Sequence, residues 1–201
     1  MAHRAVFAGF LDMMCVCMVM LLPSADAASC QAKELTDGTR SMVNESLVKF
    51  DEANGKHLGT WSPGFPELQV HRNSPVVQSK VQCSLIFMAQ GLGKVLEDQR
   101  SNLNPLDVSL HKELKNAIAR INMLANCLKS VYGGECSSPP PPPTMPRDTF
   151  ERKQWSHTLL KTSTVYLEWL HRTLKVYKGT NNTDSAQSRH QGYREGSEYL
   201  L

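Results

Sequence analysis

The sequence lacks the features that mark several common classes of protein. Its formal net charge is only +3, and no basic run is interleaved with aromatic residues, so nothing indicates a nucleic-acid partner. Neither C-x-x-C nor H-x-x-x-H spacing occurs, which argues against a zinc site. No G-x-S-x-G or H-E-x-x-H motif is present, so we predict no catalytic residue, no metal ligand and no cofactor. Apolar residues never alternate with period two for long, which argues against strands.

The amino-terminal segment is typical of a secretory signal peptide. The basic residues His3 and Arg4 precede an apolar run over residues 5–22, and a small-x-small step follows it. That order predicts a signal peptide over residues 1–27, with cleavage after Ala27. A membrane anchor is the alternative, but the run is short for a bilayer, and no other segment is apolar enough to span one. We therefore expect a secreted, extracellular protein.

Four later segments carry apolar residues at helical spacing. The clearest stripe alternates steps of four and three residues along Leu110, Leu114, Ala117, Ile121, Leu124, Leu128 and Val131. Turn and capping residues set the expected bounds. The first helix covers residues 35–50 and is closed by Gly55, and the second starts at Ser74 and Pro75. The third runs from Asn104 and Pro105 to a stop at Gly133 and Gly134, and the fourth runs from Asp148 or Thr149 to Gly179. These patterns predict an all-α protein, a long-chain four-helix bundle.

The lengths of the connections predict how the helices run. About five residues separate the second and third helices, which must therefore be antiparallel neighbours. The first connection has about twenty residues and can extend about 65 Å, whereas a helix of about 24 residues is about 36 Å long. The third connection includes five prolines at 139–143, and a polyproline segment rises about 3.1 Å per residue. We read it as a rod that crosses the bundle, with a flexible linker as the alternative. Two long crossovers around one short turn predict up-up-down-down topology.

The cysteines indicate disulfide bonds. Cys15 and Cys17 fall within the signal segment, and the cysteines of the mature chain are Cys30, Cys83, Cys127 and Cys136. An even number in a secreted chain is typical of disulfides, and four cysteines allow three pairings. The predicted topology gathers all four near one end of the bundle. We favour Cys30–Cys127 together with Cys83–Cys136, with a free thiol at Cys83 as the alternative because that residue lies off the apolar stripe.

Short motifs occur in a fixed order between the second and fourth helices. They are Leu92-Gly93, Asp98-Gln99, Leu103-Asn104-Pro105, Ser109-Leu110-His111 with Leu114, and an F-x-x-K motif formed by Phe150 and Lys153. On these residues the chain resembles the leukemia inhibitory factor and oncostatin M group of the interleukin-6 cytokine family. The resemblance covers about residues 80–153, and it is weaker over the fourth helix and poor over the first. The chain lacks the family's usual cysteine near the start of the last helix, where it reads K-Q-W-S-H-T.

The resemblance implies a cytokine, not an enzyme, that brings together two class I cytokine receptors and triggers JAK/STAT signalling. The implied partners are a leukemia inhibitory factor receptor-like subunit and a glycoprotein 130-like shared subunit, bound by a monomeric ligand with no membrane insertion. Family members that use the first of these receptors carry the F-x-x-K motif, which implies that Phe150 and Lys153 are receptor-binding residues. From spacing alone, Phe150 could instead fold inward as a helix staple beside a solvated Lys153. The alternative function, a secreted helical carrier of a small apolar ligand, predicts an internal void of about 300 Å³ or more.

Two N-x-S/T sequons predict N-glycosylation in a secreted chain. They lie at Asn44, on the first helix, and at Asn181, in the polar carboxyl-terminal segment. Residues 179–201 are rich in polar and charged residues and are predicted to be a disordered tail. The expected organisation is a signal peptide over 1–27, a four-helix cytokine domain over 28–178 and this tail.

Overall fold

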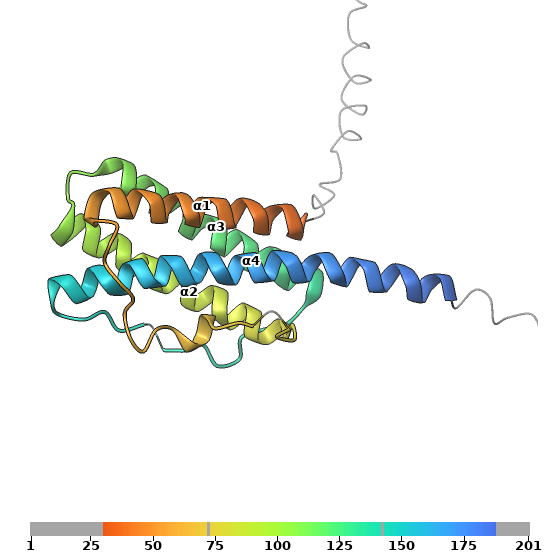
Figure 1. Ribbon diagram of the computed structural model, residues 1–201. Coiled ribbons are helices and arrows are strands. Elements are labelled where there is room, and N and C mark those ends of the chain that lie inside the picture. The colour runs from red at the N-terminus through yellow and green to blue at the C-terminus, as the bar shows by residue number, and fades with distance from the viewer. Residues whose placement is uncertain (1–29, 72, 142, 188–201) are drawn as a thin grey trace, which may run out of the picture. The chain divides into compact units, whose positions relative to one another are not determined.

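The computed structural model describes residues 30–71, 73–141 and 143–187, and over these ranges all regular structure is helical. Four long helices make up the fold: α1 (Ala32–Asn54), α2 (Gln78–Asp98), α3 (Val108–Tyr132) and α4 (Thr149–Gln187). A short 3₁₀ turn, η1 (Pro66–Leu68), lies in the first connection, and a π-helical turn, η2 (Gln99–Leu103), follows α2 directly. The predicted all-α, four-helix protein is therefore confirmed (Figure 1).

Two of the predicted helix ends are set by glycines in a left-handed conformation. Gly55 closes α1 with φ +105°, and its N–H donates to the carbonyl of Asp51. Gly133 closes α3 with φ +72°, and its N–H donates to the carbonyl of Lys129. A residue with a Cβ rarely adopts such φ values, so glycine at these positions ends a helix by local chemistry alone.

Ser74 and Asn104 do not cap helices, so these two predictions are wrong. The Oγ of Ser74 accepts a hydrogen bond from the His71 N–H at 2.8 Å, and α2 begins only beyond this turn. At α3 the cap is Asp107, whose Oδ1 accepts from the Leu110 N–H at 2.9 Å. The side chain of Asn104 is instead held by contacts with other elements, described below.

The fourth helix is longer than predicted. It begins at Thr149 as expected, but its backbone passes through Gly179 and remains helical to Gln187. The prediction that Gly179 ends the helix is therefore wrong, because one glycine costs a helix only about 1 kcal/mol relative to alanine. Of the predicted disordered tail, residues 179–187 are helical, and residues 188–201 lie outside the described part of the chain.

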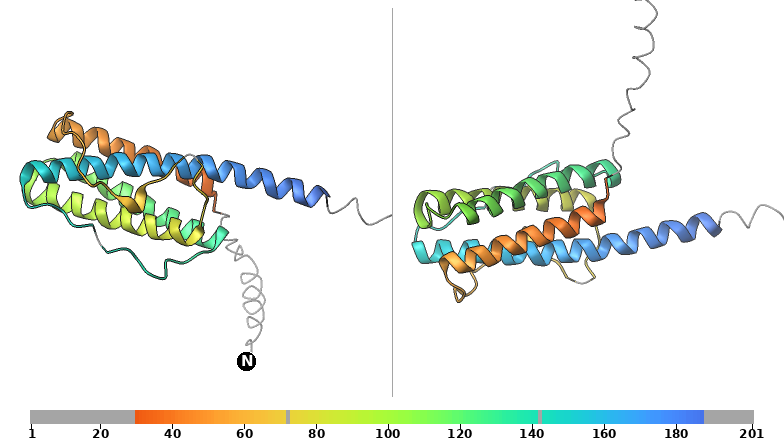
Figure 2. Two further views of the ribbon diagram at one scale, coloured as in Figure 1. Left: turned by 60° about the horizontal axis from the view of Figure 1, so that its bottom comes forward. Right: turned by 90° about the horizontal axis from the view of Figure 1, so that it is seen from above.

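The helices form a ring in which α1 packs against α3 and α4, and α2 packs against α3 (Figures 1 and 2). Between α2 and α4 the first connection contributes part of the packing. The ring of Phe65 lies edge-on to Phe87 of α2 and to Trp155 of α4, with centroids 6.1 Å and 5.3 Å apart. The two helices also approach each other at Gly91, where an added Cβ would lie 2.6 Å from the Cδ2 atom of Leu159. The crossover is thus part of the core.

The apolar stripe of α3 forms the core as predicted. Leu110, Leu114, Ala117, Ile121 and Leu124 have no exposed surface. Burying a leucine-sized side chain contributes about 1.5–3 kcal/mol, so this stripe is a major source of stability. The stripe ends earlier than predicted, because Val131 is 48% exposed.

Side-chain contacts show which helix ends lie together. The Nδ2 of Asn54, at the end of α1, donates to the Oε1 of Gln99, directly after α2, at 3.0 Å. Arg152, in the first turn of α4, lies 3.3 Å from Asp98 at the end of α2. We call this end of the bundle, where α1 and α2 end and α4 begins, the tip. At the other end, the disulfide of Cys83 joins the first turns of α2 to the segment after α3.

Candidate functional site

The first turn of α4 is fixed at the tip by an aspartate cap. The Oδ1 of Asp148 accepts from the N–H groups of Phe150 and Glu151 at 2.9 and 3.0 Å, and its carbonyl accepts from the Arg152 N–H at 2.9 Å. A carboxylate also interacts favourably with the positive end of the helix dipole. Hydrogen bonds within this segment therefore hold the backbone from residue 148 to 152, independently of contacts with other elements.

Phe150 is a surface residue. Its side chain is 55% exposed, although an aromatic ring of this size is usually largely buried. Lys153 lies one turn further along α4 and is partly buried, and residues three apart share a helix face. The alternative in which Phe150 folds inward as a staple is therefore wrong, and the two residues of the F-x-x-K motif lie side by side on the outside of α4.

Arg152 lies between these two residues in sequence and points inward. Its Nε is 3.3 Å from the Oδ1 of Asp98, a carboxylate that is only 4% exposed, and its Nη1 donates to the Arg147 carbonyl at 3.2 Å. Successive residues are about 100° apart around a helix, so residues two apart lie on nearly opposite sides. An inward Arg152 therefore goes with an outward Phe150.

A group of amides and one carboxylate ties α1 to α2 beside this turn. The fully buried Oε1 of Gln99 accepts from Asn54 and from Asn104, at 3.0 and 2.8 Å, and Asn104 also donates to the Oδ1 of Asn54 at 3.0 Å. Asn102 donates to the Oδ1 of Asp98 at 2.8 Å. We call these five residues (Asn54, Asp98, Gln99, Asn102 and Asn104) the polar clamp. Sequence reasoning missed the clamp.

The clamp gives the motifs at Asp98-Gln99 and Leu103-Asn104-Pro105 a structural role. Gln99 opens the π-helical turn η2, which widens the helix by one residue per turn and is a feature often found near functional sites. These motifs were quoted above only as marks of resemblance, yet their polar residues are the ones that hold the tip together. Their signal in the sequence was the presence of polar residues where the apolar stripe of the second helix stops.

A second polar pair joins α1 and α4 close to the tip. The Nε2 of His157 lies 3.5 Å from the Oδ1 of Asp51, and the two side chains are 13% and 22% exposed. Loss of hydration raises the pKa of the Asp51 carboxyl above its ordinary value of 3.8. Positive charge at His157, Lys56 and Lys161 opposes that rise. Burial therefore outweighs the attraction of the neighbouring cations at this carboxylate.

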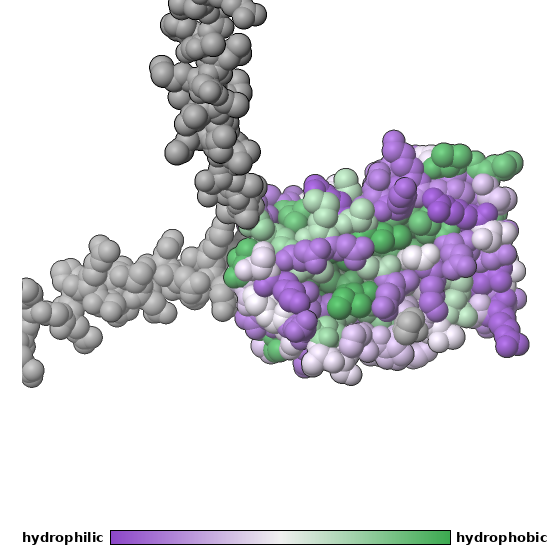
Figure 3. Space-filling view, turned by 180° about the vertical axis from the view of Figure 1, so that it is seen from behind, coloured by the Kyte–Doolittle hydropathy of each residue, from purple (hydrophilic) through white to green (hydrophobic). Residues whose placement is uncertain are grey.

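Two further apolar residues at the tip were not singled out from the sequence. Leu106 and Val108, in and after the turn that leads into α3, are 92% and 74% exposed. Figure 3 shows one face of the molecule, on which apolar residues form separate groups among hydrophilic ones. The signal that could have found this pair is an apolar pair flanking a helix cap, outside the stripe that begins at Leu110.

The disulfides agree with the predicted set of cysteines. Cys83 and Cys136 are bonded, with their Cα atoms 5.0 Å apart, so the alternative of a free thiol at Cys83 is wrong. Cys30 and Cys127 are each disulfide-bonded as well. All four cysteines predicted for the mature chain are therefore oxidised.

The two sequons differ in what the structure says about them. Asn44 is exposed on α1, while Ser46 of the same sequon is buried and its Oγ donates to the Met42 carbonyl at 2.9 Å. Asn181 lies within the helical backbone of α4, and its side chain is outside the described part of the structure. Asn44 has room for a glycan on the outer face of α1, and glycosylation of either residue stays a prediction.

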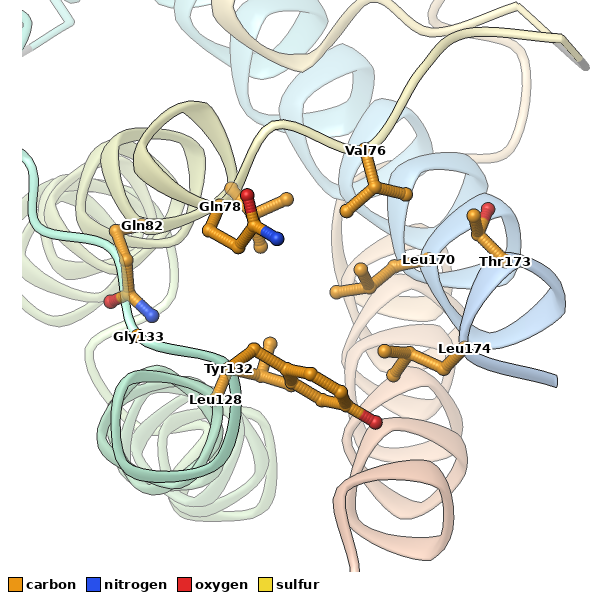
Figure 4. Close-up of a pocket in the computed structure, with 10 residues that line it drawn as sticks. Val76, Gln78, Gln82, Leu128, Tyr132, Gly133, Leu170, Thr173 and Leu174 are labelled. Atoms are coloured by element: carbon orange, nitrogen blue, oxygen red, sulfur yellow. The ribbon is translucent and has the colours of Figure 1, made fainter. Parts of the chain in front are cut away.

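A small apolar pocket lies between α2, α3 and α4 at the end opposite the tip (Figure 4). Its lining includes Val81, Leu128, Leu170 and Leu174, and the ring of Tyr132 reaches across it from α3 toward α4. The pocket has a volume of about 30 Å³, which is room for about one water molecule. This pocket is far smaller than the void that a carrier of an apolar ligand needs, and the larger hollows of about 550, 1120 and 440 Å³ on the described surface are open to solvent.

The sequence was compared with protein-family models and with curated proteins. No protein-family model matches the chain, and no curated protein matches it. Among the described helices, none has the length and apolar character needed to cross a membrane.

Proposed function

We propose that this chain is a secreted cytokine that binds two class I cytokine receptor subunits and brings them together. One subunit is leukemia inhibitory factor receptor-like, and the other is glycoprotein 130-like. The observation that carries the proposal is the 55% exposed ring of Phe150, held outward beside Lys153 on a capped helix turn. A bulky aromatic side chain kept in water at a rigid position is typical of residues that bind a partner.

The arrangement of the helix ends supports the finer topology expected of such a cytokine. The end of α1 lies with the end of α2 and the start of α4, and the start of α2 lies with the segment after α3. These pairings favour helices that run up, up, down and down, linked by two long crossovers. In that topology the start of the last helix lies at one end of the bundle, where a receptor domain can reach it from outside.

Phe150 and Lys153 would play different roles in binding. The ring of Phe150 offers rigid apolar area that a receptor pocket can bury at low entropic cost. Lys153 offers a flexible ammonium group for a receptor carboxylate at the edge of the contact, which favours rapid association more than tight binding. No chemistry is required of the ligand, since signalling follows when two receptor chains, and the JAK kinases associated with them, are brought together.

Secretion of the protein is supported by its oxidised cysteines. Disulfides such as Cys83–Cys136 persist in the extracellular space and are rare in the reducing cytosol. The apolar amino-terminal segment predicted to be a signal peptide lies outside the described residues.

The proposal is tested by titrating the secreted protein against each receptor ectodomain alone and then against both together. We expect binding to each and a ternary complex of one ligand with one copy of each subunit, measured by calorimetry and by mass in solution. Binding to neither ectodomain, with the protein folded by circular dichroism, would remove the basis of the proposal.

A further inference from the structure

The ion pair between Asp98 and Arg152 links the end of α2 to the first turn of α4 and is largely shielded from solvent. The carboxylate is 4% exposed and the guanidinium 21% exposed, so both have lost much of their hydration. A buried ion pair is weak evidence of stabilisation, because apolar side chains of the same size often serve the fold equally well or better. The pair does, however, connect the first turn of α4 to another helix, since the Nε of Arg152 lies 3.3 Å from the Oδ1 of Asp98 on α2.

We propose that Asp98 and Arg152 form a positioning pair that holds the first turn of α4 so that Phe150 and Lys153 are presented to the receptor. This inference rests on the proposed function. The pair itself does not touch the receptor in this proposal. Its role is to keep the turn ordered and facing outward before binding occurs.

The geometry of the turn supports this role. Asp148 caps the turn but lies on the same segment, so it cannot orient the turn relative to the bundle. Arg152 reaches another element, α2, and its Nη1 also holds the Arg147 carbonyl just before the helix. Because Arg152 is two residues from Phe150, pulling the guanidinium inward turns the aromatic ring outward.

The polar clamp makes Asp98 a firm anchor. The Oδ1 that faces Arg152 also accepts a hydrogen bond from Asn102 at 2.8 Å. The next residue, Gln99, is fully buried and hydrogen-bonded to Asn54 of α1 and to Asn104. If Arg152 moved away from Asp98, the ion pair would break, because Asp98 is held by Asn102 and by its neighbour Gln99.

The expected size of the effect follows from the population of the ordered turn. If the receptor binds only the ordered form, the apparent Kd equals the intrinsic Kd divided by the fraction of molecules in that form. A variant in which the turn is ordered about one tenth of the time would bind about tenfold more weakly. Surfaces away from the tip would be unaffected.

The experiment compares near-isosteric variants of the pair with a matched control in the protein as secreted. Asp98→Asn and Arg152→Gln remove the ion pair, and Arg152→Lys keeps the charge but loses the planar group. Arg172→Gln is the control, because Arg172 lies on the same helix, is 68% exposed and pairs with Glu168 at the surface. Two quantities are measured for each: amide hydrogen exchange over residues 150–153, and the Kd for each receptor ectodomain.

In Asp98→Asn and Arg152→Gln, we expect amides 150–153 to exchange about tenfold faster and the Kd for the leukemia inhibitory factor receptor-like subunit to rise about tenfold. Arg152→Lys should fall between these variants and the wild type. The Kd for the glycoprotein 130-like subunit should not change, and Arg172→Gln should match the wild type in every measurement.

Three results would overturn the proposal. Exchange that stays at the wild-type rate would show that the pair does not order the turn. Faster exchange with an unchanged Kd would show that order in the turn does not matter for binding. Equal weakening toward both subunits would indicate general loss of structure. If the wild type binds neither subunit, the proposed function and the presentation role fail together, while hydrogen exchange still decides whether the pair holds the turn.

Discussion

The contact between α2 and α4 can be tested with two glycines on the same helix. Gly91 of α2 faces α4, and an added Cβ would lie 2.6 Å from the Cδ2 of Leu159 and 3.2 Å from the Cγ of Pro143. Gly93 is two residues further on, and a Cβ added there would meet no atom within 4 Å. The two substitutions to alanine therefore make the same chemical change in opposite surroundings.

Gly93→Ala is expected to stabilise the protein, whereas Gly91→Ala is expected to leave the stability unchanged or to lower it. Replacing glycine by alanine inside a helix contributes about 1 kcal/mol, so Gly93→Ala should raise the free energy of unfolding by about that amount. Gly91→Ala gains the same term but forces a methyl group into a space that is already filled. Leu159 is fully buried and Pro143 is buried and rigid, so neither can yield freely, and overpacking costs about 1–3 kcal/mol. We expect a difference of about 1–3 kcal/mol between the variants.

The assay is equilibrium unfolding in urea, followed by the helical signal in circular dichroism, with the disulfides intact. Equal slopes for the three proteins would show that the extent of unfolding is comparable. If Gly91→Ala stabilises the protein as much as Gly93→Ala does, then α2, α4 and the proline-rich crossover do not meet at this point, and the packing described here is wrong.

Three other features give predictions of stability and modification. Replacing both Cys83 and Cys136 by alanine should lower the free energy of unfolding by about 4 kcal/mol, because the bond closes a loop of 53 residues in the unfolded chain; a loss below about 1 kcal/mol in urea unfolding would contradict this. Because burial raises the pKa of Asp51, the folded state holds that proton more tightly than the unfolded state does, and the resulting stability is lost as pH rises from about 3.8 through the raised pKa. Over this increase in pH, the free energy of unfolding of Asp51→Asn should therefore fall less than that of the wild type. The same dependence of the free energy of unfolding on pH in both proteins would refute the reasoning. Exposed Asn44 should carry a glycan, so the untreated Asn44→Gln variant should migrate faster on a gel than the untreated wild type; equal mobility of these two proteins would count against it.

Local chemistry explains which parts of the fold could be predicted from the sequence. The stripe of α3 and its stop at Gly133 depend on residues close together in the chain, and both were predicted. The predicted end of α4 at Gly179 was wrong, since the helix continues to Gln187. A glycine permits a helix to end but does not require it, so its presence in the sequence does not decide the matter. Asn104 was predicted to cap a helix because asparagine is a common capping residue. Its amide instead donates hydrogen bonds to Asn54 and Gln99.

The candidate site was predicted only in part. Phe150 and Lys153 were found through a short motif, but the spacing could not decide whether the ring pointed inward or outward, since that depends on where Arg152 finds its partner. That partner, Asp98, is distant in sequence, and so is the link between Asn54 and Gln99. Such pairings depend on how the helices assemble, and the spacing of residues within one helix does not predict which residue of another helix they will meet.

The most direct test of the central claim measures receptor affinity and stability together for Phe150→Ala. Because the ring is 55% exposed, its loss should change the free energy of unfolding by less than about 1 kcal/mol. Loss of a buried aromatic contact at the receptor should raise the Kd for the leukemia inhibitory factor receptor-like subunit by about thirtyfold, equivalent to about 2 kcal/mol. Val165→Ala, which removes a 56% exposed side chain from the same helix away from the tip, should change neither quantity. An unchanged Kd for Phe150→Ala alongside a clear loss of stability would contradict the claim and make Phe150 a structural residue.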